Sequence, residues 1–185
     1  MAAPQLTYPT PRRLTRAEYD RMIELGFFHG ERLELIRGSL LRMAPIGPTH
    51  ATTVSRLNEL LLPRLLGRAG VRIQQPLVAC DESAPEPDVA VVPLGDYSRQ
   101  HPDRAELVVE VAESSLLHDR ETKGPLYAAS NVCEYWIVDL GGRAVEIHDS
   151  AASGRYARVR RAVAGETISP SSFPDVAIAV SQLLP

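Results

Sequence analysis

The hydrophobic pattern changes period along the chain, and this change separates predicted helices from predicted strands. Residues 48–70 predict an amphipathic helix, because their apolar side chains recur at helical spacing: Val54, Leu57, Leu60, Leu61 and Leu65. Pro63 lies inside this segment and is expected to kink or split the helix. A shorter helix is predicted over residues 14–26, where Thr15 and Glu18 form a capping box.

Runs with two-residue alternation or continuous apolar character predict the strands. Residues 32–43 predict a hairpin that turns at Arg37-Gly38, and residues 105–113 predict a central strand. Residues 118–130 predict a helix, although Gly124-Pro125 is awkward inside it. The remaining predicted strands are 71–80, 88–92, 133–140, 144–149, a pair within 155–168, and a short strand with a helical turn in 173–185. This succession predicts an α/β (α+β) fold with a mixed sheet flanked by helices.

The length of 185 residues and a hydrophobic content of 44% suit one globular domain with its own core. We expect residues 1–13 to form a flexible N-terminal arm and residues 14–185 to form the domain. There is no apolar run long enough for a membrane span and no apolar core of a signal peptide. Cys80 and Cys133 match no metal spacing, so we expect reduced, half-buried thiols in a cytoplasmic protein.

Two acidic residues stand where the strand pattern is otherwise apolar. Asp88 opens the strand at 88–92, and Glu110 interrupts the strand at 105–113. An acid at a strand start is common, and Glu110 could be hydrated near the strand end. The alternative is a paired or metal-bound carboxylate, since a bare carboxylate in an apolar strand is costly. Glu34, in the predicted hairpin, is a weaker third candidate.

Lys123 is the single lysine beside 19 arginines among the 20 basic residues. Its presence is either an accident of codon usage or a sign that this position needs a compact ammonium. Such an ammonium can approach one phosphate oxygen or one water. If Asp88 and Glu110 converge at one end of the sheet, they offer the oxygen ligands that Mg²⁺ prefers. A metal there would activate water and polarise a phosphodiester, and Lys123 would hold the water or offset phosphate charge.

Three strings in this order resemble the bacterial Uma-two family, a group named as restriction endonucleases but long labelled a domain of unknown function. They are "EPDVAVVP", "LVVEVAESS" and "HDRETKGPLYAASNVCEYWIVDL", and the resemblance extends over residues 14–184. It implies a PD-(D/E)xK nuclease fold with Asp88 as the PD aspartate, Glu110 as the second acid and Lys123 as the lysine. The lysine would have moved to the next helix, because the usual position holds Ala112. Glu34 would be an additional acid lining the site.

These observations predict an endonuclease that uses Mg²⁺ or Mn²⁺ to hydrolyse DNA phosphodiester bonds. Asp88 and Glu110 are the predicted metal ligands, Lys123 is the catalytic cation, and the family's fold suggests a homodimer. Two alternatives stay open: a catalytically inactive binding module, and a metal-dependent hydrolase of a smaller phosphate ester. The net charge of −3 keeps the first alternative open, because it gives no global attraction to nucleic acid.

Several other residues remain open between a structural and a functional interpretation. His50 lies near the start of the helix predicted at 48–70. It could approach the site or lie on the surface. Tyr127 could pack over Lys123 but is more simply a core residue, and Asp119 is a candidate helix N-cap. Arg158, Arg160 and Arg161 form either a solvated strand edge or a contact to a DNA backbone.

Overall fold

The computed structural model of the protein describes residues 10–184, so most of the predicted arm at 1–13 lies outside the described residues. The last part of that arm contacts the rest of the chain, because Arg12 pairs with Glu18 and Arg13 pairs with Glu82. Along residues 10–184 no helix is long and apolar enough to cross a membrane. Cys80 and Cys133 are unpaired and exposed rather than half-buried.

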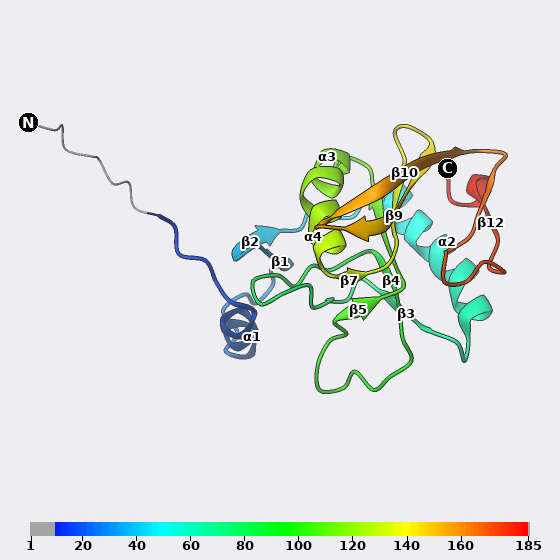
Figure 1. The fold of residues 1–185 in the computed structure, drawn as a ribbon. Helices are drawn as coiled ribbons and strands as arrows, with labels where there is room; N and C mark the ends of the chain where they lie inside the picture. Colours follow the sequence, from blue (N-terminus) through cyan, green and yellow to red (C-terminus); the bar gives the residue numbers. More distant parts are fainter. Residues whose placement is uncertain (1–9, 185) are drawn as a thin grey trace, which may run out of the picture.

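Six strands form one mixed sheet in the order β10-β9-β8-β6-β4-β3 (Figure 1). Only β6 and β8 run parallel, and the other neighbours are antiparallel. The α+β fold with a mixed sheet is therefore confirmed, and β6 lies inside the sheet as predicted. The strands span β3 Gly70–Ile73, β4 Val89–Val92, β6 Leu107–Ala112, β8 Tyr135–Asp139, β9 Ala144–Ala152 and β10 Arg155–Val163.

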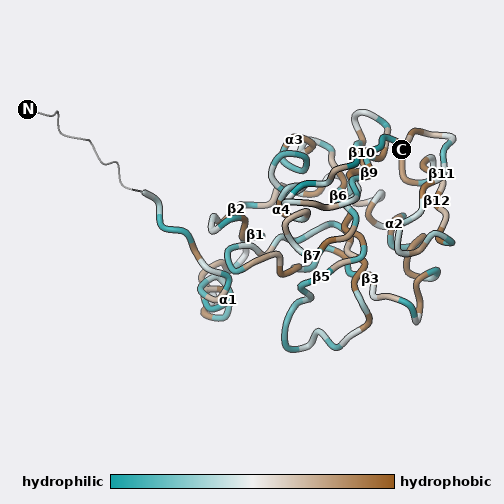
Figure 2. The backbone as a smooth tube through the Cα atoms, viewed as in Figure 1, coloured by the Kyte–Doolittle hydropathy of each residue, from teal (hydrophilic) through white to brown (hydrophobic). Residues whose placement is uncertain are grey.

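Helices cover both faces of this sheet. One face packs against α2, Pro48–Leu65, and the other against a helical segment composed of α3, η1 and α4 (Figure 1). That segment spans Leu116–His118, Asp119–Lys123 and Gly124–Ala129. Alternation along the strands divides the core accordingly, since Val109 joins the cluster under α2 and Val108 joins the cluster with Tyr127. Figure 2 shows hydrophobic positions in the middle of the molecule and hydrophilic positions in the loop before β5.

The N-terminal elements follow their local signals. Helix α1, Arg16–Glu24, has the predicted capping box between Thr15 and Glu18. The hairpin of β1, Leu33–Ile36, and β2, Ser39–Arg42, turns through Arg37 and Gly38, whose φ angles are 48° and 75°. Both angles are positive, as a two-residue hairpin turn of type I′ requires. This turn confirms the predicted hairpin.

Three predictions about elements are corrected. Helix α2 is not split at Pro63. Pro63 gives the Glu59 carbonyl no N–H, but Glu59 is exposed, so water can hydrate that carbonyl. The strand predicted at 71–80 ends at Ile73, since Gln74 has a φ of 49°. The pair predicted within 155–168 does not form, because β10 pairs with β9 and β11 pairs with β12. The small strands are β5 Arg104–Ala105, β7 Asn131–Val132, β11 Thr167–Ile168 and β12 Ile178–Ala179, followed by η2 Val180–Gln182.

Candidate active site

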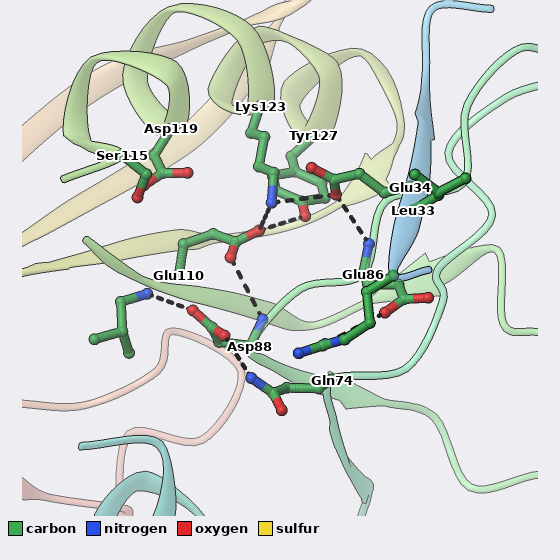
Figure 3. Close-up of polar contacts among 12 residues, drawn as sticks. Leu33, Glu34, Gln74, Glu86, Asp88, Glu110, Ser115, Asp119, Lys123 and Tyr127 are labelled. Atoms are coloured by element: carbon green, nitrogen blue, oxygen red, sulfur yellow. Dashed lines mark hydrogen bonds and ion pairs between the residues drawn. The ribbon is translucent and has the colours of Figure 1, made fainter. Parts of the chain in front are cut away.

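Asp88, Glu110 and Lys123 meet at one end of the sheet (Figure 3). Asp88 directly precedes β4 and Glu110 lies in β6, and these neighbouring strands pair Val89 with Val109. One step further in that register, Asp88 stands beside Glu110. The Nζ atom of Lys123 lies 3.0 Å from Oε1 of Glu110. The structure thus brings together the two acids and the lysine that the sequence singled out.

The Asp88 carboxylate is held by donors from three elements. Its Oδ2 accepts the backbone N–H of Val111 at 2.9 Å and lies 3.0 Å from Nε2 of His50, while Oδ1 accepts from Gln74 at 3.2 Å. Burial alone would raise the pKa of Asp88, but the bond with His50 and the other donors outweigh it and lower that pKa. Asp88 therefore stays ionised. His50, left open from the sequence, reaches the site from the first turn of α2.

The backbone of Val111 also lies beside the two acids. The N–H of Val111 points to Asp88, and the N–H and C=O of one strand residue face the same edge, so its carbonyl faces this space too. Two carboxylates and one carbonyl consequently surround the same space.

Glu110 is buried and accepts two hydrogen bonds on one oxygen. The Tyr127 hydroxyl donates to Oε1 at 2.8 Å beside the Lys123 ammonium, and the Asp88 N–H donates to Oε2 at 3.4 Å. Burial raises the pKa of Glu110 to about 8, and Lys123 acts against that rise. Tyr127 is in the core as the sequence favoured, but its hydroxyl belongs to the site.

Lys123 is shared between two acids from different strands. Its Nζ also lies 3.3 Å from Oε2 of Glu34 in β1, an oxygen that accepts the N–H of Glu86. Burial alone would lower the pKa of Lys123, but Glu110, Glu34 and Asp119 raise it above its usual range. The lysine therefore keeps its proton. An ammonium has three donors, so two partners leave one N–H for water or phosphate.

A widened helical turn carries Lys123. The N–H of Gly124 bonds to the carbonyl of Asp119 five residues earlier, and Pro125 needs no acceptor, so Gly124-Pro125 fits inside the helical segment. Such π-type turns are frequent at functional sites. Asp119 is not the predicted N-cap, because the helix begins a turn earlier at Leu116. Its buried carboxylate instead accepts the Ser115 hydroxyl at 2.5 Å.

These side chains line an open cavity of about 430 Å³, with Arg32 and Arg42 from the hairpin on its wall. Within residues 10–184, no three His, Cys, Asp or Glu side chains form a group that could hold a metal by themselves. Asp88, Glu110 and the Val111 carbonyl nevertheless supply hard oxygen donors. Mg²⁺ prefers such donors and keeps several waters, so this donor set fits it.

The other predicted candidates lie away from this cavity. Arg158 pairs with Asp149 at 2.7 Å, Arg160 lies 3.6 Å from Glu166, and Arg161 donates to a carbonyl, all on the exposed edge strand β10. This is the solvated strand edge that the sequence allowed.

A family model described as "Putative restriction endonuclease" and named Uma2 matches residues 16–181. The chain belongs to the Uma2 family. The resemblance to Uma-two proteins is thereby confirmed. The fold of this Uma2 protein is also similar to the crystal structure of a "putative nuclease belonging to DUF820" from Anabaena variabilis ATCC 29413. The TM-score is 0.67 at 10% identity, over 83% of this chain and 89% of that one. No curated protein matches the chain.

Proposed function

We propose that this Uma2 protein is an endonuclease that uses Mg²⁺ or Mn²⁺ to hydrolyse DNA phosphodiester bonds. The observation that carries the proposal is the meeting of Asp88, Glu110 and Lys123 in one open cavity, with the Lys123 ammonium 3.0 Å from Glu110. These groups come from three separate segments of the chain, and each group has the chemistry that phosphodiester hydrolysis needs. Membership of the Uma2 family supports the same conclusion.

Each residue has a distinct part in the proposed reaction. A metal held by Asp88, Glu110 and the Val111 carbonyl would polarise the phosphodiester and lower the pKa of a bound water. Lys123 cannot serve as the general base, because the neighbouring carboxylates keep it protonated. Its remaining N–H instead orients the attacking water or stabilises charge that develops on the phosphate. Asp88, held ionised by His50 and Val111, is ready to bind a cation.

The charge of the cavity supports a requirement for a cation. Its wall contains six acidic residues, and a phosphate would be repelled there without a counter-charge. Those acids are Glu34, Glu86, Asp88, Glu110, Glu113 and Asp119. Arg32 and Arg42 lie on the same wall, so they are the expected contacts to the DNA backbone. This arrangement makes the net charge of −3 compatible with DNA cleavage.

The proposal includes a homodimer and a cytoplasmic site of action. Two copies of the active site would be needed to cut both strands in one binding event. We also propose that residues 14–185 act as one domain. The intact pair of acids and the lysine favour catalysis over an inactive binding module.

Cleavage of supercoiled plasmid tests the function directly. We expect wild type to nick plasmid in Mg²⁺ or Mn²⁺ and to stop when EDTA is added. Asp88→Asn should be inactive, whereas Asp103→Asn, which removes an exposed acid from a loop, should cut normally. Absence of cleavage of any DNA or RNA by folded wild type would favour the binding module. Cleavage of a small phosphodiester alone would favour the hydrolase of smaller esters.

A further inference from the structure

The two oxygens of Glu110 have different surroundings. Oε1 receives both side-chain donors, the Lys123 ammonium at 3.0 Å and the Tyr127 hydroxyl at 2.8 Å (Figure 3). Within the described part of the chain, Oε2 accepts only the N–H of Asp88, at 3.4 Å. Oε2 is therefore the oxygen on the Asp88 side and is left for a further ligand.

Tyr127 is the better fixed of the two donors. It lies four residues after Lys123, so both side chains leave the same side of the helical segment. Its ring is fully buried and packs on Tyr135, with the ring centroids 5.1 Å apart. Lys123 has a flexible stem and divides its donors between Glu110 and Glu34. The hydroxyl therefore defines where Oε1 lies more closely than the ammonium does.

We propose that Tyr127 is a positioning residue: its hydroxyl fixes Oε1 of Glu110 and so directs Oε2 toward Asp88 and the Val111 carbonyl. Oε2 would then be the oxygen that Glu110 offers to a metal, and the side chain would not first have to settle into one rotamer. This inference rests on the proposed function. A glutamate side chain loses considerable rotamer freedom when it is ordered, and partners that orient a ligand reduce that loss at the moment of metal binding.

The chain offers a closely matched control in Tyr135. Both tyrosines are fully buried, and each hydroxyl makes one hydrogen bond. The Tyr135 hydroxyl donates to the Asp119 carbonyl at 3.3 Å rather than to Glu110. Tyr127→Phe and Tyr135→Phe thus remove the same atom from the same aromatic cluster, but only the first touches Glu110. A general loss of packing would affect both variants alike.

Calorimetric titration with Mn²⁺ is the first measurement. We expect Tyr127→Phe to bind Mn²⁺ about 10- to 100-fold more weakly than wild type, the usual cost of losing a partner that orients a ligand. Tyr135→Phe should stay within about 2-fold, since it leaves every donor to the ligands in place. Raising the Mn²⁺ concentration should restore plasmid cleavage by Tyr127→Phe. Wild-type affinity in Tyr127→Phe, or equal losses in both variants, would overturn the positioning role and leave the proposed function standing.

Crystal structures of metal-free wild type and Tyr127→Phe separate this inference from the function. We expect the Glu110 carboxylate to rotate or lose its order in Tyr127→Phe. An unchanged Glu110 rotamer would refute the positioning role whatever the metal data show. A wild type that binds no Mn²⁺ would refute the metal-dependent function, while rotation of Glu110 would still support its positioning by Tyr127.

Discussion

Along β6, Val109 and Val111 point to the face covered by α2, whereas Val108 and Glu110 point to the face covered by α3, η1 and α4. The first face is filled by aliphatic side chains and Trp136 beneath one long helix. The second face buries Glu110 with Lys123, and Glu146 with Arg120. Aliphatic packing stabilises the first face directly, but each buried charge on the second needs a partner to offset its desolvation.

The covering helices differ in the same way. Helix α2 presents Leu57, Leu61 and Leu65 at regular helical spacing. The segment over the second face is divided into short pieces, with a widened turn at Asp119–Lys123. Regular helical spacing is enough to bury an apolar surface against the sheet. Each chemical group on the second face must instead be placed so that it reaches a particular partner. We therefore expect substitutions on the first face to change stability alone and substitutions on the second to change chemistry as well.

Removal of the Lys123 ammonium should have the largest effect. Lys123→Ala leaves Glu34 and Glu110 buried without their cation, and loss of one preorganised electrostatic group costs about 10²–10³ in rate. Lys123→Arg should also be poor, because a wide planar fork cannot replace a compact ammonium. Plasmid cleavage in Mg²⁺ would be compared at matched folding by circular dichroism. If the Arg variant cuts as fast as wild type, the single lysine is an accident of codon usage.

A cavity on the first face should lower stability without touching the chemistry. Leu57 in α2 is fully buried, so Leu57→Ala should reduce the free energy of unfolding by about 2–5 kcal/mol. Leu62 in the same helix is 44% exposed, and Leu62→Ala should change it by less than about 0.5 kcal/mol. Urea unfolding measures both values. A change in Mn²⁺ affinity of folded Leu57→Ala would show that the two faces are not independent.

Removal of the charge from each of the two proposed metal ligands should have smaller effects on stability, of different size. Burial raises the pKa of Glu110 to about 8, so Glu110→Gln relieves a desolvation cost but also removes a carboxylate partner of Lys123. These two effects oppose each other, so Glu110→Gln should change the urea midpoint at pH 7 only slightly. The pKa of Asp88 is lowered against burial by its bonds with His50 and Val111, so Asp88→Asn should lower that midpoint. Both variants should lose specific Mn²⁺ binding. Unchanged Mn²⁺ affinity in both would rule out the metal site.

The first face could be predicted from the sequence because its signals are local. The spacing of Leu57, Leu61 and Leu65 identifies the buried side of a helix without knowledge of its partner. The capping box at Thr15 and the Arg37-Gly38 turn are likewise decided by neighbouring residues. Asp88 and Glu110 could be singled out because they are acids in apolar strands, and Lys123 because it is the single lysine. The family resemblance pointed to the same three residues.

The remaining site residues could not be predicted because their roles depend on long-range packing. A buried tyrosine has the same sequence pattern whether or not its hydroxyl meets Glu110, so the sequence left Tyr127 open between packing over Lys123 and a core position. His50 reaches Asp88 only because α2 begins beside β4 in space. The widened turn at Asp119–Lys123 has no periodic signature, so the sequence predicts a helix that begins at Asp119 rather than a turn earlier.

The smallest expected effect concerns His148, a histidine on the second face. It lies in β9 between Tyr135 and Tyr156, with ring centroids 5.5 and 6.1 Å away, and its side chain is 12% exposed. Burial lowers the pKa of His148 below its ordinary value of 6.5, although the neighbouring Glu146 acts against this. The unfolded chain therefore binds a proton more readily than the folded protein does. The contribution of His148 to the free energy of unfolding is therefore fully present above pH 6.5. It declines as the pH falls from 6.5 through the lowered pKa.

The test compares urea unfolding at pH 7.5 and pH 5.5 in wild type and His148→Gln. His50 has a pH dependence of the opposite sign. The hydrogen bond with Asp88 raises the pKa of His50, so the contribution of His50 to stability is lost as the pH rises. The difference between the two proteins isolates His148, since His50 is present in both. We expect His148→Gln to lose less stability than wild type on acidification, whereas His29→Gln, at an exposed position, should behave as wild type. If His148→Gln loses as much as wild type, burial on this face does not disfavour the charged imidazole. The contrast between the two faces would then be confined to the residues around Glu110.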